Sequence, residues 1–245
     1  MRVLLINPNT TPEVTDIIHQ RVRPMLGEED VVLPVTGRFG ARYISSRVAA
    51  AIAAHAGLDL LASHVAGCDA VYLACFGDPG LLALREVSPV PVIGMAEASC
   101  RAACERGERF AIVTGGALWK PMLTEFVAAL GLADRFAGVQ TIALTGDLIA
   151  RDPDAALADL ASACERCRTE GSADIVILGG AALAGLAALI QPNVSIPLLC
   201  SVETGMQAVI SAARQPRQGS QRELGPVKTI GLSPALETLL AATSN

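Results

Sequence analysis

The same order of apolar segments occurs twice in this chain, about 106 residues apart. The segment that begins at Arg2 matches the one that begins at Arg109, a shift of 107 residues. Asp69–Cys75 matches Asp174–Gly180 at a shift of 105, and the segment from Val90 recurs at a shift of 106. Strands recur at intervals in any alternating chain, but three shifts that agree within two residues indicate a duplication. The chain is therefore expected to fold as two similar halves.

Strand-like and helix-like patterns alternate in each half. Apolar runs of strand length occur at Val3–Ile6, Val31–Val35, Val71–Cys75, Val92–Gly94, Phe110–Thr114, Val139–Leu144, Ile175–Gly179, Leu198–Cys200 and Thr229–Leu232. Helical patterns fill the gaps at Pro12–Leu26, Ser45–Ala66, Pro79–Glu86, Ala96–Arg106, Pro121–Leu130, Asp154–Glu170, Leu183–Gln191 and Glu203–Ala213, and a C-terminal helix follows the last strand. This alternation predicts an α/β fold with parallel sheets and right-handed crossovers.

The duplication divides the predicted α/β fold into two lobes. Residues 1–97 plus 206–245 are expected to form the first lobe and residues 98–205 the second. Ligands of parallel α/β sheets bind beyond the carboxyl ends of the strands. If the lobes face each other, their strand-end loops line one cleft, and the active site is expected in that cleft.

The composition narrows the classes of partner. Hydrophobic residues make up 51% of the chain and aromatic residues only 3%, which suits an aliphatic core of buried parallel strands. A net charge of −5 without a basic block argues against nucleic acid as a partner. The longest apolar stretch, Ile175–Ile190, has 16 residues and is too short to span a membrane comfortably. The apolar start turns polar at Asn7, too soon for a signal peptide, so a cytoplasmic protein is expected. The polar stretch Arg214–Gly225 is predicted to be a surface loop.

The cysteines and histidines give no metal-binding pattern. Cys164 and Cys167 form a C-x-x-C, but no second pair has the spacing of a zinc finger and no histidine lies near. They occur in an alanine-rich helical pattern, where a spacing of three places two small side chains on one face. His19, His55 and His64 also lie in helical patterns, so each is expected on the surface or in packing. No metal or cofactor is predicted.

Two of the expected strand-end loops carry polar or glycine residues. In the first, Thr11 is predicted to be the N-cap of a helix that has Pro12 at its first position. Asn9 either offers a polar group to a ligand or forms a plain Asx-turn. In the counterpart loop, Thr114-Gly115-Gly116 either lets the backbone approach a ligand closely or makes a tight turn. Trp119 follows this loop and either edges the cleft or packs its helix.

The other two loops differ in their chemistry. Cys75 follows an apolar run, and Asp78 with Pro79 is predicted to cap the next helix and to form its first turn. A thiol ahead of a helix N-terminus is expected to have a lowered pKa and to serve as a general base toward a C–H group. A buried structural cysteine is the alternative. The matching loop has Gly180, which carries no proton, although its backbone N–H groups suit an oxyanion or a carboxylate.

Four segments of the chain, in order, resemble those of the Asp/Glu/hydantoin racemase superfamily, and most closely the hydantoin and allantoin racemase branch. These segments are Ile6–Thr10, Ala74–Leu81, Pro91–Glu97 and Ile177–Ala181. The resemblance implies two flavodoxin-like (Rossmann-like) lobes related by a pseudo-twofold axis, cofactor-independent chemistry and a homo-oligomer. It also implies that one cysteine removes the proton next to a carbonyl while a second returns a proton on the opposite face.

The chain departs from this family at Gly180, which stands where the second catalytic cysteine is usual. The resemblance assigns Cys75 and the Gly180 position to catalysis. It implies that a small-molecule substrate is bound by Pro8, Asn9, Phe76, Gly77, Thr114, Gly115 and Ala181. The family uses the segment Gly37–Ile44 near the substrate, so Arg42 and Tyr43 either line the site or belong to a mobile surface loop. The related arylmalonate decarboxylase branch also has a single thiol, but its glycine is at the first-lobe position, so this chain resembles the mirror case.

Three functions remain open from the sequence. The first is a cofactor-independent racemase, an isomerase acting next to a carbonyl of a hydantoin-like or amino-acid-derived substrate, with Cys75 as proton acceptor and donor. The second is a cofactor-free decarboxylase or isomerase of a malonate-like acid that uses Cys75 as the sole proton donor. The third is a catalytically silent paralogue that still binds a ligand.

Overall fold

The computed structural model describes residues 1–215 and 227–242, which form two parallel sheets of four strands each. The strand orders are β2-β1-β3-β4 and β6-β5-β7-β8, so the second sheet repeats the plan of the first. The strands are β1 (Arg2–Asn7), β2 (Val31–Thr36), β3 (Ala70–Leu73), β4 (Val92–Gly94), β5 (Phe110–Gly115), β6 (Phe136–Ile142), β7 (Ile175–Leu178) and β8 (Leu198–Cys200).

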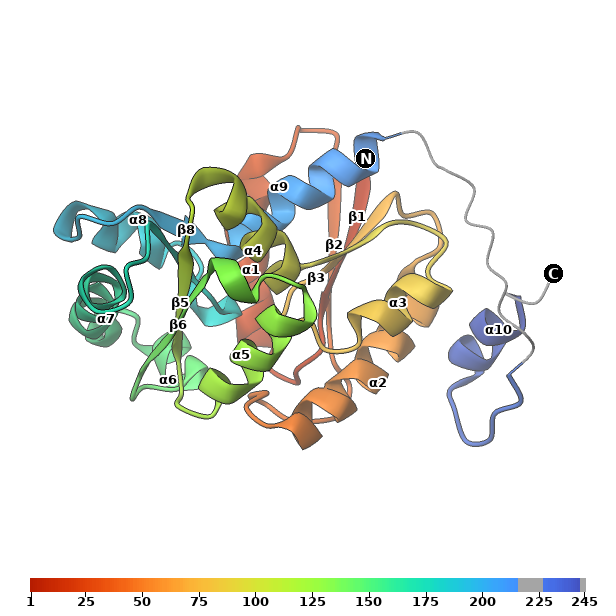
Figure 1. The fold of residues 1–245 in the computed structure, drawn as a ribbon. Helices are drawn as coiled ribbons and strands as arrows, with labels where there is room; N and C mark the ends of the chain where they lie inside the picture. The colour runs from red at the N-terminus through yellow and green to blue at the C-terminus, as the bar shows by residue number, and fades with distance from the viewer. Residues whose placement is uncertain (216–226, 243–245) are drawn as a thin grey trace.

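Helices cover both sheets (Figure 1). The α-helices are α1 (Pro12–Val22), α2 (Arg47–His64), α3 (Leu81–Val87), α4 (Met95–Arg106), α5 (Trp119–Ala129), α6 (Gly146–Arg151), α7 (Leu157–Thr169), α8 (Leu186–Ile190), α9 (Ser201–Arg214) and α10 (Pro234–Ala242). Short 3-10 helices occur at η1 (Arg23–Met25), η2 (Ala133–Arg135), η3 (Asp154–Ala156), η4 (Ala181–Leu183) and η5 (Gln191–Asn193).

The central strands of both sheets are buried along almost their whole length. In β1 every residue after Arg2 is buried, and β3, β5 and β7 are buried throughout. Strands covered by helices on both faces need continuous apolar runs, and the aliphatic composition supplies them. The predicted α/β fold with two lobes is therefore confirmed, and all the strand pairs in the two sheets are parallel.

Two helices cross between the lobes. Helix α4 follows β4 of the first sheet but packs against β7 of the second, and α9 follows β8 but packs against β3 and β4. The two helices also pack against each other, and Figure 1 shows them side by side in the middle of the molecule. The lobe boundaries predicted at residues 97/98 and 205/206 fall inside these two helices. The C-terminal helix α10 packs against α2 of the first lobe.

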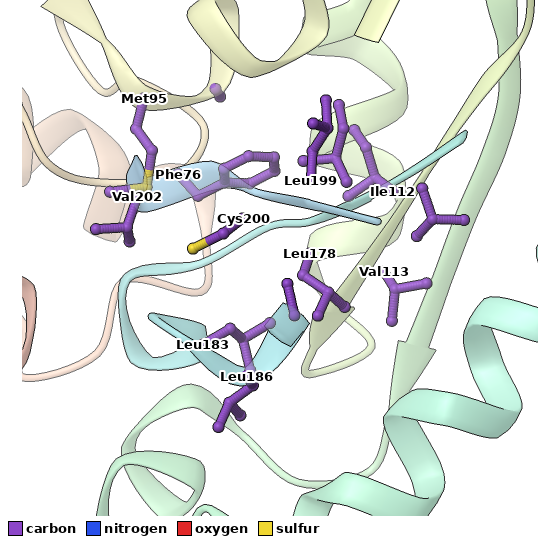
Figure 2. Packing of buried hydrophobic residues seen from close by; sticks show 14 of the residues in the cluster. Phe76, Met95, Ile112, Val113, Leu178, Leu183, Leu186, Leu199, Cys200 and Val202 are labelled. Atoms are coloured by element: carbon purple, nitrogen blue, oxygen red, sulfur yellow. The ribbon is translucent and has the colours of Figure 1, made fainter. Parts of the chain in front are cut away.

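The contact between the lobes is part of the main hydrophobic core. Figure 2 shows Phe76 and Met95, from the first half of the chain, close to residues of the second sheet such as Leu199 and Cys200. Tyr72 is fully buried on β3, and its hydroxyl donates a hydrogen bond to the carbonyl oxygen of Val202 at 2.9 Å. A shared core and a buried cross-lobe hydrogen bond hold the two sheets in a fixed relation.

One prediction of secondary structure is wrong, and one helix was missed. The segment Thr229–Leu232 forms no strand and leads instead into α10; Ile230 is almost completely exposed. Helix α6 was not predicted, since six residues are too few to show a helical period. The surface loop predicted at Arg214–Gly225 falls almost wholly outside the described residues.

In the part of the chain that the structure describes, no helix is long and apolar enough to cross a membrane. Within the same residues, no group of three or more His, Cys, Asp or Glu side chains is arranged to hold a metal ion.

Candidate active site

A cavity of about 60 Å³ lies between the lobes, where the central strands of both sheets end. Cys75 follows β3, Thr114 and Gly115 end β5, and Gly180 follows β7. The walls are mostly apolar, and the residues that line them are Asn9, Val14, Arg42, Tyr43, Ile44, Cys75, Phe76, Thr114, Gly115, Trp119, Gly146, Asp147, Ile149, Gly179, Gly180, Ala181, Ala182 and Leu183. Of the site residues that the sequence predicted, Pro8 and Gly77 do not line this cavity.

Cys75 is only 7% exposed and belongs to the wall formed by the first lobe. Burial, reinforced by the negative charge of Asp78, raises its pKa to about 12. The predicted lowering of this pKa is therefore wrong. Helix α3 starts only at Leu81, six residues further on, so the thiol is not at a helix N-terminus. At neutral pH Cys75 is a protonated thiol, suited to give a proton before it takes one.

The sequence predicts that Asp78 caps the helix that follows it. This prediction is wrong, because no side chain caps the start of α3. Asp78 adopts a positive φ of 48° and turns its buried carboxylate toward the start of α4. There it accepts hydrogen bonds from the backbone N–H of Ala96 at 2.8 Å and of Glu97 at 2.7 Å. Burial raises the pKa of Asp78 to about 7, although the two backbone hydrogen bonds act to lower it. The carboxylate thus joins the turn after Cys75 to the first turn of α4.

Gly180 has the conformation that only glycine adopts easily. Its φ of +143° and ψ of 141° lie in a region that other residues occupy only with strain. A Cβ atom placed there would find room, since its nearest neighbours, in Leu183 and the Thr114 hydroxyl, would be 3.7 Å away. The site has space for a side chain on this wall, but the backbone is shaped for glycine.

The backbone N–H groups near Gly180 are only partly available to a ligand. The Gly180 N–H was expected to bind an oxyanion of the substrate. Instead it donates a hydrogen bond to the hydroxyl of Ser201 at 3.2 Å. The N–H groups of Ala181 and Ala182 begin the 3-10 turn η4 and have no acceptor within it. Any anion site on this wall therefore rests on Ala181 and Ala182.

Thr114 places a hydroxyl on the cavity wall beside Gly180. The residue is 5% exposed, and no hydrogen bond joins its hydroxyl to another side chain or backbone group among the described residues. A buried hydroxyl without a protein partner is uncommon, because its desolvation costs about 1–3 kcal/mol. This hydroxyl is therefore a candidate for hydrogen bonding to a substrate.

Asn9 forms the Asx-turn and also lies on the cavity wall. Its side-chain oxygen accepts from the Thr11 N–H and from the Asn7 amide, both at 2.9 Å, which makes an Asx-turn. The residue also lines the cavity. Thr11 is the N-cap residue of α1 and Pro12 opens the helix, as predicted, but the Thr11 hydroxyl donates to the Arg42 carbonyl rather than capping the helix.

Tyr43 ties a loop of the first lobe to the second lobe. Its hydroxyl donates to the Gly115 carbonyl at 2.9 Å and accepts from the Trp119 indole N–H at 3.0 Å. Arg42 and Trp119 line the cavity with it. Sequence reasoning missed Gly146, Asp147 and Ile149, because it did not predict the short helix α6 that carries them.

Aromatic side chains cross between the lobes at two glycines. The Phe76 ring occupies the space where Gly179 lacks a side chain, and the Trp119 ring does the same at Gly77. Gly77 thus shapes the site from behind the wall, without lining the cavity. The remaining cysteine pair, Cys164 and Cys167, is buried in α7 away from the cavity.

The whole arrangement is similar to known racemases. Residues 3–209 match the family model described as Asp/Glu/Hydantoin racemase. A hydantoin racemase from Pseudomonas sp. (strain NS671) is 29% identical over 208 residues, 84% of each chain. The structure of allantoin racemase from Pseudomonas fluorescens superposes with a TM-score of 0.89 at 27% identity, covering 94% of this chain and 100% of that one. Allantoin racemase from Klebsiella pneumoniae gives a TM-score of 0.86 at 29% identity, with 98% of each chain covered.

Arylmalonate decarboxylase has the same fold at 17% identity, with a TM-score of 0.64. The two-lobed fold, the cavity between the lobes and a match along residues 3–209 agree with one another. The chain belongs to the Asp/Glu/Hydantoin racemase family.

Proposed function

We propose that the protein is a cofactor-independent racemase that moves a proton at the carbon next to a carbonyl in a hydantoin-like or amino-acid-derived substrate. The position of Cys75 carries this proposal: it is a buried thiol at a strand end, on the wall of a small cavity between two lobes. The named activities of the similar proteins, hydantoin racemase and allantoin racemase, support this class of substrate.

Cys75 serves one face of the reacting carbon. The substrate loses a proton to form an enolate, whose oxygen needs hydrogen-bond donors. The Thr114 hydroxyl and the N–H groups of Ala181 and Ala182 are suited to that role, since none of them has a hydrogen-bond acceptor or donor among the residues that the structure describes. With the pKa of Cys75 raised to about 12, the thiol is held protonated and is ready to deliver its proton to the enolate carbon.

The proposal is tested by following each enantiomer separately in heavy water. 5-Substituted hydantoins, allantoin and N-carbamoyl amino acids form the panel; NMR reports deuterium at the reacting carbon and chiral chromatography reports inversion. The wild-type chain is expected to exchange and invert at least one of these substrates. Cys75→Ala is expected to lower the rate of inversion by about 10²–10⁴-fold, the usual cost of removing a catalytic acid or base. A folded wild-type chain that neither exchanges nor inverts any member of the panel contradicts the proposal.

A second function, decarboxylation of a malonate-like acid, is favoured by the asymmetry between the two walls. Loss of CO₂ leaves an enediolate that needs one proton on one face, and a single protonated thiol at Cys75 suffices for that, whereas Gly180 offers none. A panel of disubstituted malonates distinguishes this function: release of CO₂ with one product enantiomer supports it, and no turnover excludes it. A homo-oligomer and a cytoplasmic location stay predictions.

A further inference from the structure

Racemisation needs a proton carrier on each face of the reacting carbon, and Gly180 provides none on the wall opposite Cys75. This inference rests on the proposed racemase function and asks which group serves that second face. Among the cavity-lining residues of the second lobe, Asp147 is the one that carries a carboxylate. It was not recognisable from the sequence, because the helix on which it lies was not predicted.

The topology brings Asp147 to the Gly180 wall. Asp147 is on α6, which follows β6, and β6 lies next to β5, whose end carries Thr114. Helix α6 packs against η4, the turn that starts directly after Gly180. The Thr114 hydroxyl in turn lies beside the place where a Gly180 side chain would begin. Asp147, Thr114 and Gly180 therefore belong to one continuous wall of the cavity, built entirely from the second lobe.

A hydrogen bond orients the carboxylate of Asp147, and no basic side chain among the described residues forms an ion pair with it. The Thr145 hydroxyl donates to its Oδ1 atom at 2.6 Å. No ion pair joins Asp147 to a lysine or arginine among the residues that the structure describes, although Arg42 also lines the cavity. One hydrogen bond leaves Oδ2 and the remaining lone pairs available, as a general base requires.

Tyr43 lies within electrostatic range of both walls. Burial raises the pKa of its phenol most, and the negative charges of Asp147 and of a Cys75 thiolate raise it further. Its ring also occupies the space where Gly146, the residue before Asp147, has no side chain. Asp147, Cys75 and Tyr43 all line the same cavity.

We infer that Asp147 is the catalytic residue that exchanges a proton on the face opposite Cys75, in place of the second thiol. In one direction the carboxylate takes the proton from carbon, the C–H electron pair becomes the enolate, and the Cys75 S–H gives its proton to the other face. This leaves a Cys75 thiolate and an Asp147 carboxylic acid. The starting state returns when the acid gives its proton to water and the thiolate takes one from water, or when the opposite enantiomer reacts in reverse. Carboxylates act as bases toward such carbon acids in other enzymes.

The test uses Asp147→Asn in the full chain and the same exchange assay with separate enantiomers. Asparagine keeps an oxygen acceptor for the Thr145 hydroxyl but cannot take a proton from carbon. Exchange from one enantiomer is expected to fall by about 10²-fold or more, while exchange from the other persists and inversion is lost in both directions. Cys75→Ala is expected to give the complementary result, losing exchange from the opposite enantiomer. Asp134→Asn, on an exposed carboxylate of the same lobe that does not line the cavity, serves as the matched control and should behave as wild type.

Two outcomes overturn the assignment to Asp147. Equal loss from both enantiomers indicates a structural role, and unchanged exchange from both indicates none. If Asp147→Asn does not fold, as judged by circular dichroism, Asp147→Glu decides, because it keeps the carboxylate and must retain exchange from both enantiomers. A wild-type chain that exchanges neither enantiomer of any substrate refutes the racemase function itself, and the role of Asp147 falls with it. Loss of deuterium exchange from only one enantiomer supports the role of Asp147. Failure of that role alone therefore differs from failure of the racemase function, in which the wild-type chain exchanges neither enantiomer.

Discussion

The loop after β3 and the loop after β7 occupy the same place in the two halves of the duplicated fold, but they are held by opposite means. The first carries Cys75 and is fastened to the start of α4 by the buried carboxylate of Asp78. The second carries Gly180 at a positive φ and is held by backbone hydrogen bonds, such as those of Gly179 N–H to Val113 and Leu183 N–H to Gly180, and by the Gly180 N–H bond to the Ser201 hydroxyl. A duplicated fold thus keeps its strand ends in register while each loop takes its own chemistry.

The largest expected effect is on the rate at which Cys75 is alkylated in the folded chain compared with the unfolded chain. With a pKa of about 12, only about one molecule in 10⁴ carries a thiolate at pH 8, against about a quarter for an unperturbed cysteine. Alkylation by iodoacetamide, followed by peptide mass spectrometry, is therefore expected to be about 10³-fold slower than in the urea-unfolded chain. The rate should rise about tenfold per pH unit beyond pH 9. A plateau below pH 9 would show that the thiol is not held protonated.

Removing the Asp78 carboxylate tests how firmly the first loop is fastened. Asp78→Ala leaves two backbone N–H groups without an acceptor and is expected to lower the free energy of unfolding by about 3 kcal/mol. Chemical denaturation measures this, with the exposed Asp134→Ala as a control expected to stay within about 0.5 kcal/mol.

The pH dependence of that loss has a definite sign. The folded pKa of Asp78, about 7, lies above its ordinary value of 3.8, so the folded chain binds the proton more tightly. The contribution of this group to stability is largest at acid pH and is lost as the pH rises through about 7. The difference between wild type and Asp78→Ala should therefore be larger at pH 5 than at pH 8, and the reverse order would contradict the raised pKa.

In the loop after β7, a substitution at Gly180 is expected to lower the stability less than Asp78→Ala does. Gly180→Ala has room for its methyl group but must adopt a φ near +143°, so it should lower the free energy of unfolding by about 2 kcal/mol. Gly131, with a φ of +73° and open space, is the matched control, and its replacement by alanine should cost about 1 kcal/mol. If both variants cost the same, the backbone at Gly180 is not specialised.

The smallest expected effect concerns the bridge between the lobes. Tyr43→Phe leaves the Trp119 indole N–H without its acceptor and should lower the free energy of unfolding by about 1 kcal/mol. Because Trp119 is the single tryptophan, its fluorescence should change as well. Tyr72→Phe, at the other tyrosine, breaks a different cross-lobe hydrogen bond and should leave the fluorescence unchanged. Identical spectra for both variants and wild type would show that Tyr43 does not control the surroundings of Trp119.

The sequence predicted the strands well and the caps poorly, for a physical reason. Strands such as Val92–Gly94 and Leu198–Cys200 were predicted to the residue, since buried strands need continuous apolar runs. Asp78 looked like the cap of α3 because it precedes that helix, yet its carboxylate reaches α4, which lies far along the chain but close in space. A side chain's partner depends on the packing of distant segments, and local spacing does not contain that information.

The two lobes, their parallel sheets and the placement of Cys75 opposite Gly180 in the duplicated plan followed from the sequence alone, because hydrophobic periodicity and strand-end position are local properties that a duplication repeats. The tertiary structure decided the protonation state of Cys75, since burial and the charge of Asp78 arise only when the chain is folded. It also decided that Asp147 lines the cavity, because a six-residue helix becomes visible only through the surfaces against which it packs.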